Sequence, residues 1–98
     1  NTVLDVGAGT GALCAALKEE GYNVTGVDAA EKMIKVAHRK TKKLNIQFDI
    51  GNALEGLPYQ DNQFDIVIAS YVAHGLKLDK RKKLYHEMAR VANKKVII

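Results

Sequence analysis

Short apolar runs rich in valine and isoleucine alternate along this chain with segments of helical periodicity. Such alternation favours parallel strands, because each strand must be reached through a long crossover, usually a helix. Strands are expected at residues 3–6, 23–27, 46–50, 64–69 and 96–98. We therefore expect an α/β fold with a doubly wound, mainly parallel sheet. At 98 residues the chain is long enough for one domain, spanning 1–98.

The segments between these strands carry apolar side chains at helical spacing. Helices are expected at residues 11–20 and 31–40, the first of them followed by Gly21 at a C-cap position. A last helix is expected to start from Asp79 as its N-cap. Its apolar face would consist of Leu84, Met88, Val91 and Ala92. The stretch 51–62 contains proline and turn residues, which predicts an irregular loop.

Glycine and polar residues, which a hydrophobic core does not require, follow the carboxyl ends of four of the expected strands. They are the glycine turn 7–11, Asp28, Asn52 and Ser70. In a doubly wound sheet these strand ends lie along one edge, and ligands bind there where the strand order reverses. The sequence therefore predicts a ligand site at this edge.

The glycine turn reads Asp-Val-Gly-Ala-Gly-Thr-Gly over residues 5–11. Glycine accepts positive φ and lets a ligand approach the backbone closely. The helix that follows adds free N–H groups and the positive end of its dipole, which suits a carboxylate. Glycine is also common in tight strand-to-helix turns that bind nothing, so the turn alone does not identify a site.

Asp28 stands 21 residues after Gly7, at the end of the second expected strand. A carboxylate there can accept hydrogen bonds from both hydroxyls of a ribose, and its alternative role is a helix N-cap. The spacing Gly7-x-Gly9-x-x-Ala12 also satisfies the dinucleotide fingerprint. Two interpretations therefore stay open at this point: a nicotinamide or flavin oxidoreductase, and a protein that binds another adenosine-containing cofactor.

Asp5 lies inside the first expected strand, two residues before Gly7. A carboxylate at this position would repel a pyrophosphate but attract a cation. It therefore favours a cationic adenosine cofactor over a dinucleotide. No lysine follows the turn, which excludes a Walker-type phosphate loop.

Several ordered segments resemble motifs of the class I S-adenosylmethionine-dependent methyltransferases. They are residues 3–11, 24–28, 51–67 and 89–91. The resemblance covers nearly the whole chain and implies a Rossmann-like core with strand order 3-2-1-4-5. Sheets of this family continue with two more strands, so we expect the sequence to be truncated after strand five, an excerpt of a longer domain.

The resemblance implies that S-adenosylmethionine, with S-adenosylhomocysteine as the product, is held by Asp5, Gly7, Ala8, Gly9, Asp28, Ala29, Met33, Asn52, Ala53 and Ser70. The glycine turn would face the methionine part through backbone groups. Asp5 would steady the turn and lie near the amino group, and Ser70 would lie beside the methionine end.

The same resemblance implies roles around the adenosine part. Asp28 would hold the ribose, while Ala29 and Met33 would give the adenine an apolar wall. Asn52 and Ala53 would border the adenine edge. Asparagine departs here from the family's usual aspartate, so a hydrogen bond from the adenine amino group would lose charge assistance.

Methyl transfer from a sulfonium needs alignment and exclusion of water more than it needs a protein nucleophile, and none is assigned. His74, just beyond the fourth expected strand, is the candidate general base, with a structural or solvent-facing histidine as the alternative. No metal site is expected, because the histidines show no ligand spacing. A cofactor-binding domain without transfer activity stays open as an alternative function.

The expected partner is a small-molecule acceptor. Nucleic acid stays open as an alternative partner, since the net charge is +4 and basic residues gather after residue 76. A membrane partner is not expected, because no apolar run approaches the roughly 18 residues of a bilayer span. The apolar strand 96–98 would form an open sheet edge, through which self-association is expected. The lone cysteine, Cys14, is expected to be a small buried hydrophobic residue and favours a reducing, cytoplasmic location.

Overall fold

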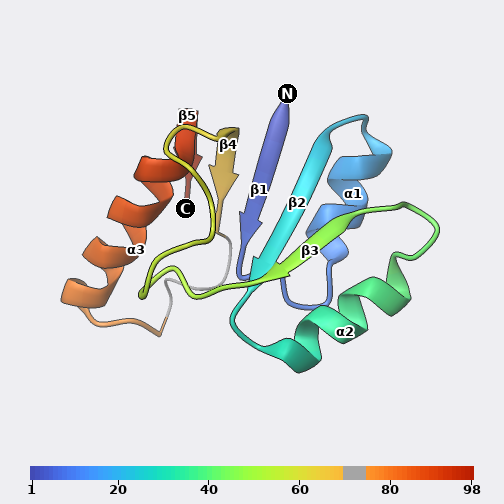
Figure 1. The fold of residues 1–98 in the computed structure, drawn as a ribbon, viewed down its shortest axis with the longest axis horizontal. Helices are drawn as coiled ribbons and strands as arrows, with labels where there is room; N and C mark the ends of the chain where they lie inside the picture. Colours follow the sequence, from blue (N-terminus) through green and yellow to red (C-terminus); the bar gives the residue numbers. More distant parts are fainter. Residues whose placement is uncertain (70–74) are drawn as a thin grey trace.

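The computed structural model describes residues 1–69 and 75–98. In this part of the chain, parallel strands form one sheet in the order β3-β2-β1-β4-β5 (Figure 1). The strands are β1 Thr2–Val6, β2 Asn23–Asp28, β3 Gln47–Ile50, β4 Phe64–Ile68 and β5 Ala92–Ile97. The helices are α1 Ala12–Glu19, α2 Glu31–Lys40 and α3 Leu78–Val91. The predicted doubly wound α/β fold and its strand order are confirmed.

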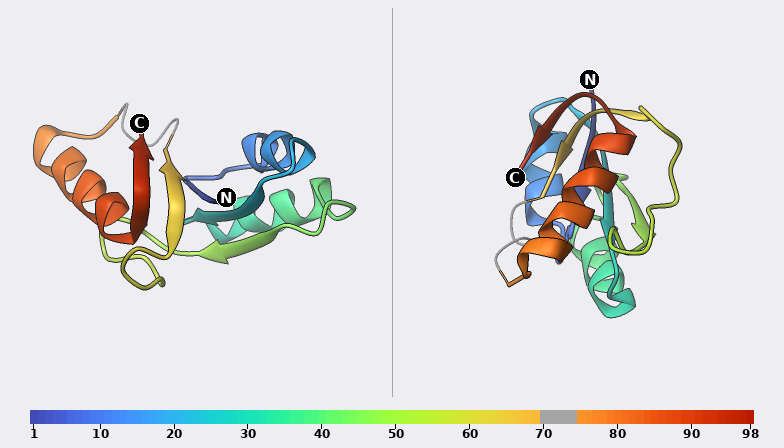
Figure 2. Two further views of the ribbon diagram at one scale, coloured as in Figure 1. Left: turned by 90° about the horizontal axis from the view of Figure 1, so that it is seen from above. Right: turned by 90° about the vertical axis from the view of Figure 1, so that its left-hand side faces the viewer.

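Helices cover the sheet on both faces. α1 and α2 pack against β2 and β3, and α3 packs on the opposite face, against β4 and β5 (Figure 2). Side chains alternate across a strand, so β1 supplies both layers. Leu4 and Val6 belong to the buried cluster under α3, whereas Val3 belongs to the cluster under α1 and α2.

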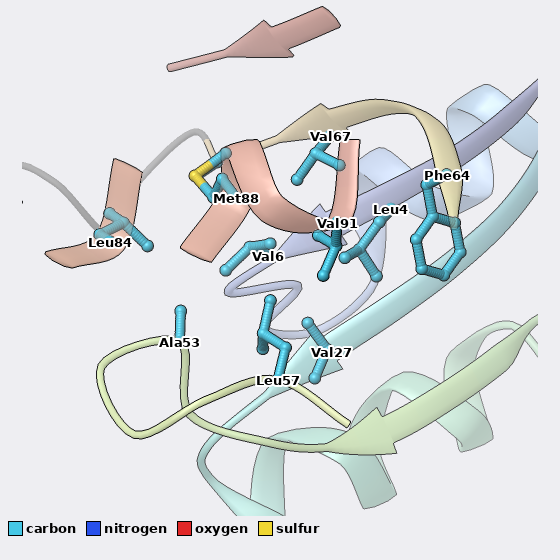
Figure 3. Close-up of a cluster of buried hydrophobic side chains, with 11 residues drawn as sticks. Leu4, Val6, Val27, Ala53, Leu57, Phe64, Val67, Leu84, Met88 and Val91 are labelled. Atoms are coloured by element: carbon cyan, nitrogen blue, oxygen red, sulfur yellow. The ribbon is translucent and has the colours of Figure 1, made fainter. Parts of the chain in front are cut away.

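The core beneath α3 is drawn in Figure 3. Leu84 and Met88 are fully buried against the sheet residues Leu4 and Val67. Each such side chain contributes roughly 2 kcal/mol of transfer free energy. The loop between β3 and β4 inserts Leu57 into the same cluster, so this loop is fixed to the core rather than lying free on the surface.

Two expected boundaries near the end of the chain are wrong. α3 begins at Leu78 after Lys77, whose extended backbone carries no side-chain cap, so Asp79 lies in the first helical turn and is not the N-cap. A carboxylate is favourable there because it faces the positive end of the helix dipole. β5 starts at Ala92, directly after α3, instead of at residue 96. Ala92 therefore belongs to the strand and not to the helical face, and it pairs with Phe64.

β5 forms one edge of the sheet. The expected edge was short and apolar, but the strand is longer and includes the exposed residues Lys94 and Lys95. Charged side chains on an edge strand oppose pairing with a second chain. Self-association through this edge stays a prediction, and the two lysines weaken the reason for it.

Gly26 in β2 offers a test of how tightly the glycine turn packs on the sheet. A Cβ atom at this position would lie 2.6 Å from Cδ1 of Phe48 and 2.9 Å from Cβ of Ala8. We expect Gly26→Ala to lower the free energy of unfolding by about 1 to 3 kcal/mol, as measured by urea denaturation. Gly75→Ala is the control, since a Cβ there meets no described heavy atom within 4 Å. Equal stability of Gly26→Ala and wild type would contradict this packing.

Candidate functional site

The turn between β1 and α1 is built from backbone conformations that favour glycine. Gly7, Gly9 and Gly11 have φ of 76°, 57° and 84°. The turn is bound to the neighbouring strand, because the N–H groups of Gly7 and Ala8 both donate to the carbonyl oxygen of Val27, at 2.8 and 3.0 Å. The residues of the turn therefore lie in a fixed position at the carboxyl ends of β1 and β2.

Asp28, the last residue of β2, connects this turn with the next one. Its Oδ2 accepts a hydrogen bond from the Gly9 N–H at 2.8 Å, and its Oδ1 accepts one from the Ala30 N–H at 2.9 Å. The N-cap of α2 is Ala30, so Asp28 is not the helix cap that its position also allowed. A carboxylate offers about four acceptor sites, and those not used by the backbone remain for a ligand.

A pocket of about 300 Å³ opens at the carboxyl ends of β1, β2 and β3. Its lining consists of Val6, Gly7, Asp28, Ala29, Gly51, Asn52, Ala53, Leu54 and Leu84. Five of the residues selected from the sequence are therefore brought together here. Apolar walls with two polar side chains, Asp28 and Asn52, are typical of pockets that bind small organic molecules.

Four lining residues are not among the candidates predicted from the sequence: Val6, Gly51, Leu54 and Leu84. Gly51 follows β3 directly, and this position alone was a signal for it. A Cβ at Gly51 would lie 3.0 Å from Cδ of Pro58 and from Cγ2 of Val27, so the backbone is closely packed there. The sequence predicts Leu84 on the apolar core face of the last helix, and nothing in its spacing distinguishes a pocket wall from a core position.

The side chain of Asn52 has an internal role at this edge. Its Oδ1 accepts a hydrogen bond from the Leu54 N–H at 2.9 Å, which holds the start of the β3–β4 loop. Gly51 donates its N–H to the carbonyl oxygen of Asp28 at 3.1 Å, which joins the ends of β2 and β3. An aspartate at position 52 would preserve the acceptor for Leu54.

A second pocket of about 210 Å³ lies along the glycine turn and shares Gly7 with the first. Its lining consists of Asp5, Gly7, Ala8, Gly9, Thr10, Ala12 and Leu13. The predicted residues Asp5, Ala8 and Gly9 therefore meet here. The two pockets together follow the edge of the sheet from β1 to β3.

Asp5 is a buried residue in the lining of this second pocket, with 2% of its surface exposed. Its Oδ2 accepts a hydrogen bond from the thiol of Cys14 at 3.5 Å, while Oδ1 has no partner among residues 1–69 and 75–98. Burial raises the pKa of Asp5 to about 6, the Cys14 bond opposes this rise, and the charge of Asp28 adds to it. A cation bound nearby would stabilise the ionised form.

Three candidates are not placed in either pocket. Met33 lies in the first turn of α2 with 42% of its surface exposed, and it does not line the first pocket. Ser70 and His74 lie outside the described residues. Their roles, like those of the other cofactor contacts, stay predictions.

Arg90 of α3 fixes the loop that forms the far wall of the first pocket. Its guanidinium donates to the carbonyl oxygens of Leu57 and Tyr59, at 3.2 and 2.9 Å, and pairs with Glu87 and Asp61. Hydrogen bonds from Arg90 hold the pKa of Glu87 below its ordinary value, and Glu87 in turn accepts the N–H of Leu57. The sequence identifies Arg90 only as a basic residue in the segment 89–91, which resembles a family motif, and does not predict these contacts.

Comparison with known proteins identifies the family. Residues 3–95 match the family described as methyltransferase domain, which is nearly the whole chain. The chain belongs to this methyltransferase family. Its resemblance to the class I S-adenosylmethionine-dependent enzymes is thereby confirmed.

Known relatives of this domain are also named methyltransferases. It is 39% identical over 92 residues to the uncharacterized methyltransferase YcgJ of Bacillus subtilis, covering 91% of this chain and 35% of that protein. It is 39% identical over 90 residues to a demethylmenaquinone methyltransferase of Renibacterium salmoninarum, again with 91% and 35% coverage. The domain therefore spans about a third of the length of these relatives.

A solved structure shows the same architecture. The methyltransferase domain matches a SAM-dependent methyltransferase from Aquifex aeolicus with a TM-score of 0.78 and 31% identity, covering 93% of this chain and 50% of the other. These likenesses favour a methyltransferase and give no support to the dinucleotide oxidoreductase. Within residues 1–69 and 75–98, no helix has the length and apolarity needed to cross a membrane.

The burial of Asp5 predicts how the stability of the ligand-free protein depends on pH. The folded pKa of about 6 exceeds the unfolded value of 3.8. The contribution of Asp5 to stability is therefore fully present below pH 3.8 and is lost as the pH rises through 6. Between pH 5 and pH 7 this loss amounts to about 1 kcal/mol of unfolding free energy.

Asp5→Asn removes this titration, so the stability of the variant relative to wild type should be more favourable at pH 7 than at pH 5. Urea denaturation at the two pH values measures the difference. Asp79→Asn, which changes an exposed carboxylate, is the matched control. A wild-type to Asp5→Asn difference that is the same at both pH values would contradict the raised pKa of Asp5.

Proposed function

We propose that this domain binds S-adenosylmethionine along the edge formed by β1, β2 and β3, and that the protein transfers its methyl group to a small-molecule acceptor. One observation carries the proposal. A pocket lined by Asp28 and Asn52 shares Gly7 with a second pocket, whose lining includes the buried Asp5. A neutral adenosine part and a cationic part of one ligand match this pair of pockets.

The first pocket suits the adenosine part. Asp28 retains acceptor sites for the ribose hydroxyls beyond the two used by the Gly9 and Ala30 N–H groups. Ala29 and Leu54 offer apolar surface to a flat ring, and Asn52 lies beside them in the lining. Met33 remains a proposed second wall, which would require its exposed side chain to turn toward the ligand.

The second pocket suits a cation. Asp5 brings a buried carboxylate with an unpartnered oxygen among the described residues, and the turn adds the backbone of Gly7, Ala8 and Gly9. A pyrophosphate would place negative charge close to Asp5 and Asp28, which is unfavourable. The charges therefore favour a sulfonium cofactor with an ammonium group over a dinucleotide.

When bound, S-adenosylmethionine supplies an activated methyl group on a cationic sulfur. The chain's own contribution is to fix and orient the cofactor, through the hydrogen-bonded turns at Gly9 and Asp28. Such alignment accounts for a large part of the rate enhancement in displacement reactions. His74 stays the proposed base for an acceptor that must lose a proton, and Ser70 a proposed neighbour of the methionine end.

A small-molecule acceptor is supported by the relatives named demethylmenaquinone methyltransferase, although this domain covers only about a third of their length. Nucleic acid is the alternative acceptor that the net charge of +4 supports. A cytoplasmic location is part of the same proposal, because Cys14 is a free thiol, as expected in a reducing compartment.

Calorimetric titration tests the cofactor. We expect heat of binding from S-adenosylhomocysteine and none from NAD at the same concentration. Binding of NAD instead would restore the oxidoreductase interpretation. A methyl-transfer assay with the full-length protein then separates an enzyme from a domain that only binds the cofactor.

Asp28→Asn tests the ribose contact. The amide keeps one acceptor oxygen but replaces the other by a donor, so it cannot serve the two N–H groups and the ribose together. We expect the affinity for S-adenosylhomocysteine to fall about 10- to 100-fold in calorimetry. Asp79→Asn, on the exposed side of α3, should leave the affinity unchanged. Unchanged affinity in Asp28→Asn would limit Asp28 to a structural role.

A further inference from the structure

Cys14 of α1 is placed directly against the carboxylate of Asp5. Its Sγ lies 3.5 Å from Oδ2 of Asp5, and neither side chain is exposed by more than 2%. The sequence predicted only that Cys14 would be a buried hydrophobic residue, and burial is confirmed. Its contact with an ionisable group was not predicted, because helical spacing does not show which buried positions face β1.

The direction of this hydrogen bond follows from the surroundings of the thiol. Burial raises the pKa of Cys14 well above its ordinary value, and the neighbouring charge of Asp5 raises it further. The thiol therefore keeps its proton and donates, while the carboxylate accepts. Thiols are weak donors, but a charged acceptor strengthens the bond.

The two carboxylate oxygens of Asp5 therefore differ in their hydrogen bonding. Oδ2 is held by Cys14, and Oδ1 is buried without a partner among the described residues. Asp5 also lines the pocket at the glycine turn together with Gly9. A buried carboxylate oxygen without a partner is costly unless a ligand donates to it.

We propose that Cys14 is a positioning residue of the cofactor site, whose thiol holds one oxygen of Asp5 so that the other faces a cationic group bound at the glycine turn. The proposal rests on the proposed function. The chemical class it selects is a ligand with an ammonium group, which donates hydrogen bonds as well as charge. Cys14 acts through Asp5 and does not itself contact the ligand.

The groups around Asp5 determine how removal of the Cys14 thiol changes the pKa of Asp5. Cys14 faces it from α1, and Asp28 acts on it from the end of β2. On β4 its register partner is the uncharged Ile68. Cys14 is thus the neighbour that favours the ionised carboxylate, while burial and Asp28 disfavour it. Without the thiol, Asp5 should take up its proton at a higher pH.

Calorimetry of S-adenosylhomocysteine binding from pH 5 to pH 8 tests this with the full protein, because this ligand retains the ammonium group. In wild type the affinity should fall as the pH decreases through about 6, where Asp5 becomes protonated. In Cys14→Ala the midpoint of this fall should move up by about 0.5 to 1 pH unit. Cys14→Ser restores a donor, so its midpoint should lie at or below that of wild type.

The carboxyl titration of Asp5, followed by NMR in the ligand-free protein, gives a readout that does not depend on the cofactor. The same order of midpoints is expected there. Equal midpoints in wild type and Cys14→Ala, or equal upward shifts in the Ala and Ser variants, would overturn the role of Cys14. If the NMR order holds but wild type binds no S-adenosylhomocysteine at any pH, the proposed function fails, and the positioning role for that cofactor fails with it.

Discussion

The candidate site depends on the two hydrogen bonds that the carboxylate of Asp28 accepts. This carboxylate accepts the Gly9 N–H with one oxygen and the Ala30 N–H with the other, and so joins the β1–α1 turn to the β2–α2 turn. Both turns follow strands that pair in parallel register, which brings their carboxyl ends to the same edge. Without this bridge, the β1–α1 turn would be joined to β2 only through the bonds of Gly7 and Ala8 to Val27, and its Gly9 end would lose its contact with Asp28. A ligand that spans both pockets needs the two turns in one fixed arrangement.

The far wall of the site depends on a different set of contacts. The β3–β4 loop has little regular structure, yet Leu57 packs in the core and Arg90 binds two of the loop's carbonyl oxygens. α3 thus determines where Ala53 and Leu54 lie beside the pocket. Asp5, unlike the contacts of Arg90, lowers the stability of the ligand-free fold. Its charge is buried, and a cationic ligand bound nearby would stabilise the ionised carboxylate.

Most of the architecture and part of the site could be predicted from the sequence, because both follow from local patterns. Apolar strands, helical periodicity and the glycines at 7, 9 and 11 are readable one segment at a time. The continuous passage from α3 into β5 was missed, since residues 93–95 are polar and the strand is defined by its pairing with β4. The roles of Leu84, Arg90 and Cys14 were missed for the same reason. Each depends on a partner far away in sequence, which spacing along one helix does not identify.

The most direct measurement is a crystal structure of the protein with S-adenosylhomocysteine. We expect ribose hydroxyls within about 3 Å of the Asp28 carboxylate. We also expect the adenine beside Ala29 and Asn52, and the ammonium group at the glycine turn facing Asp5. A ligand that lies elsewhere on the domain, or one whose ribose leaves Asp28 bonded only to Gly9 and Ala30, would contradict the account.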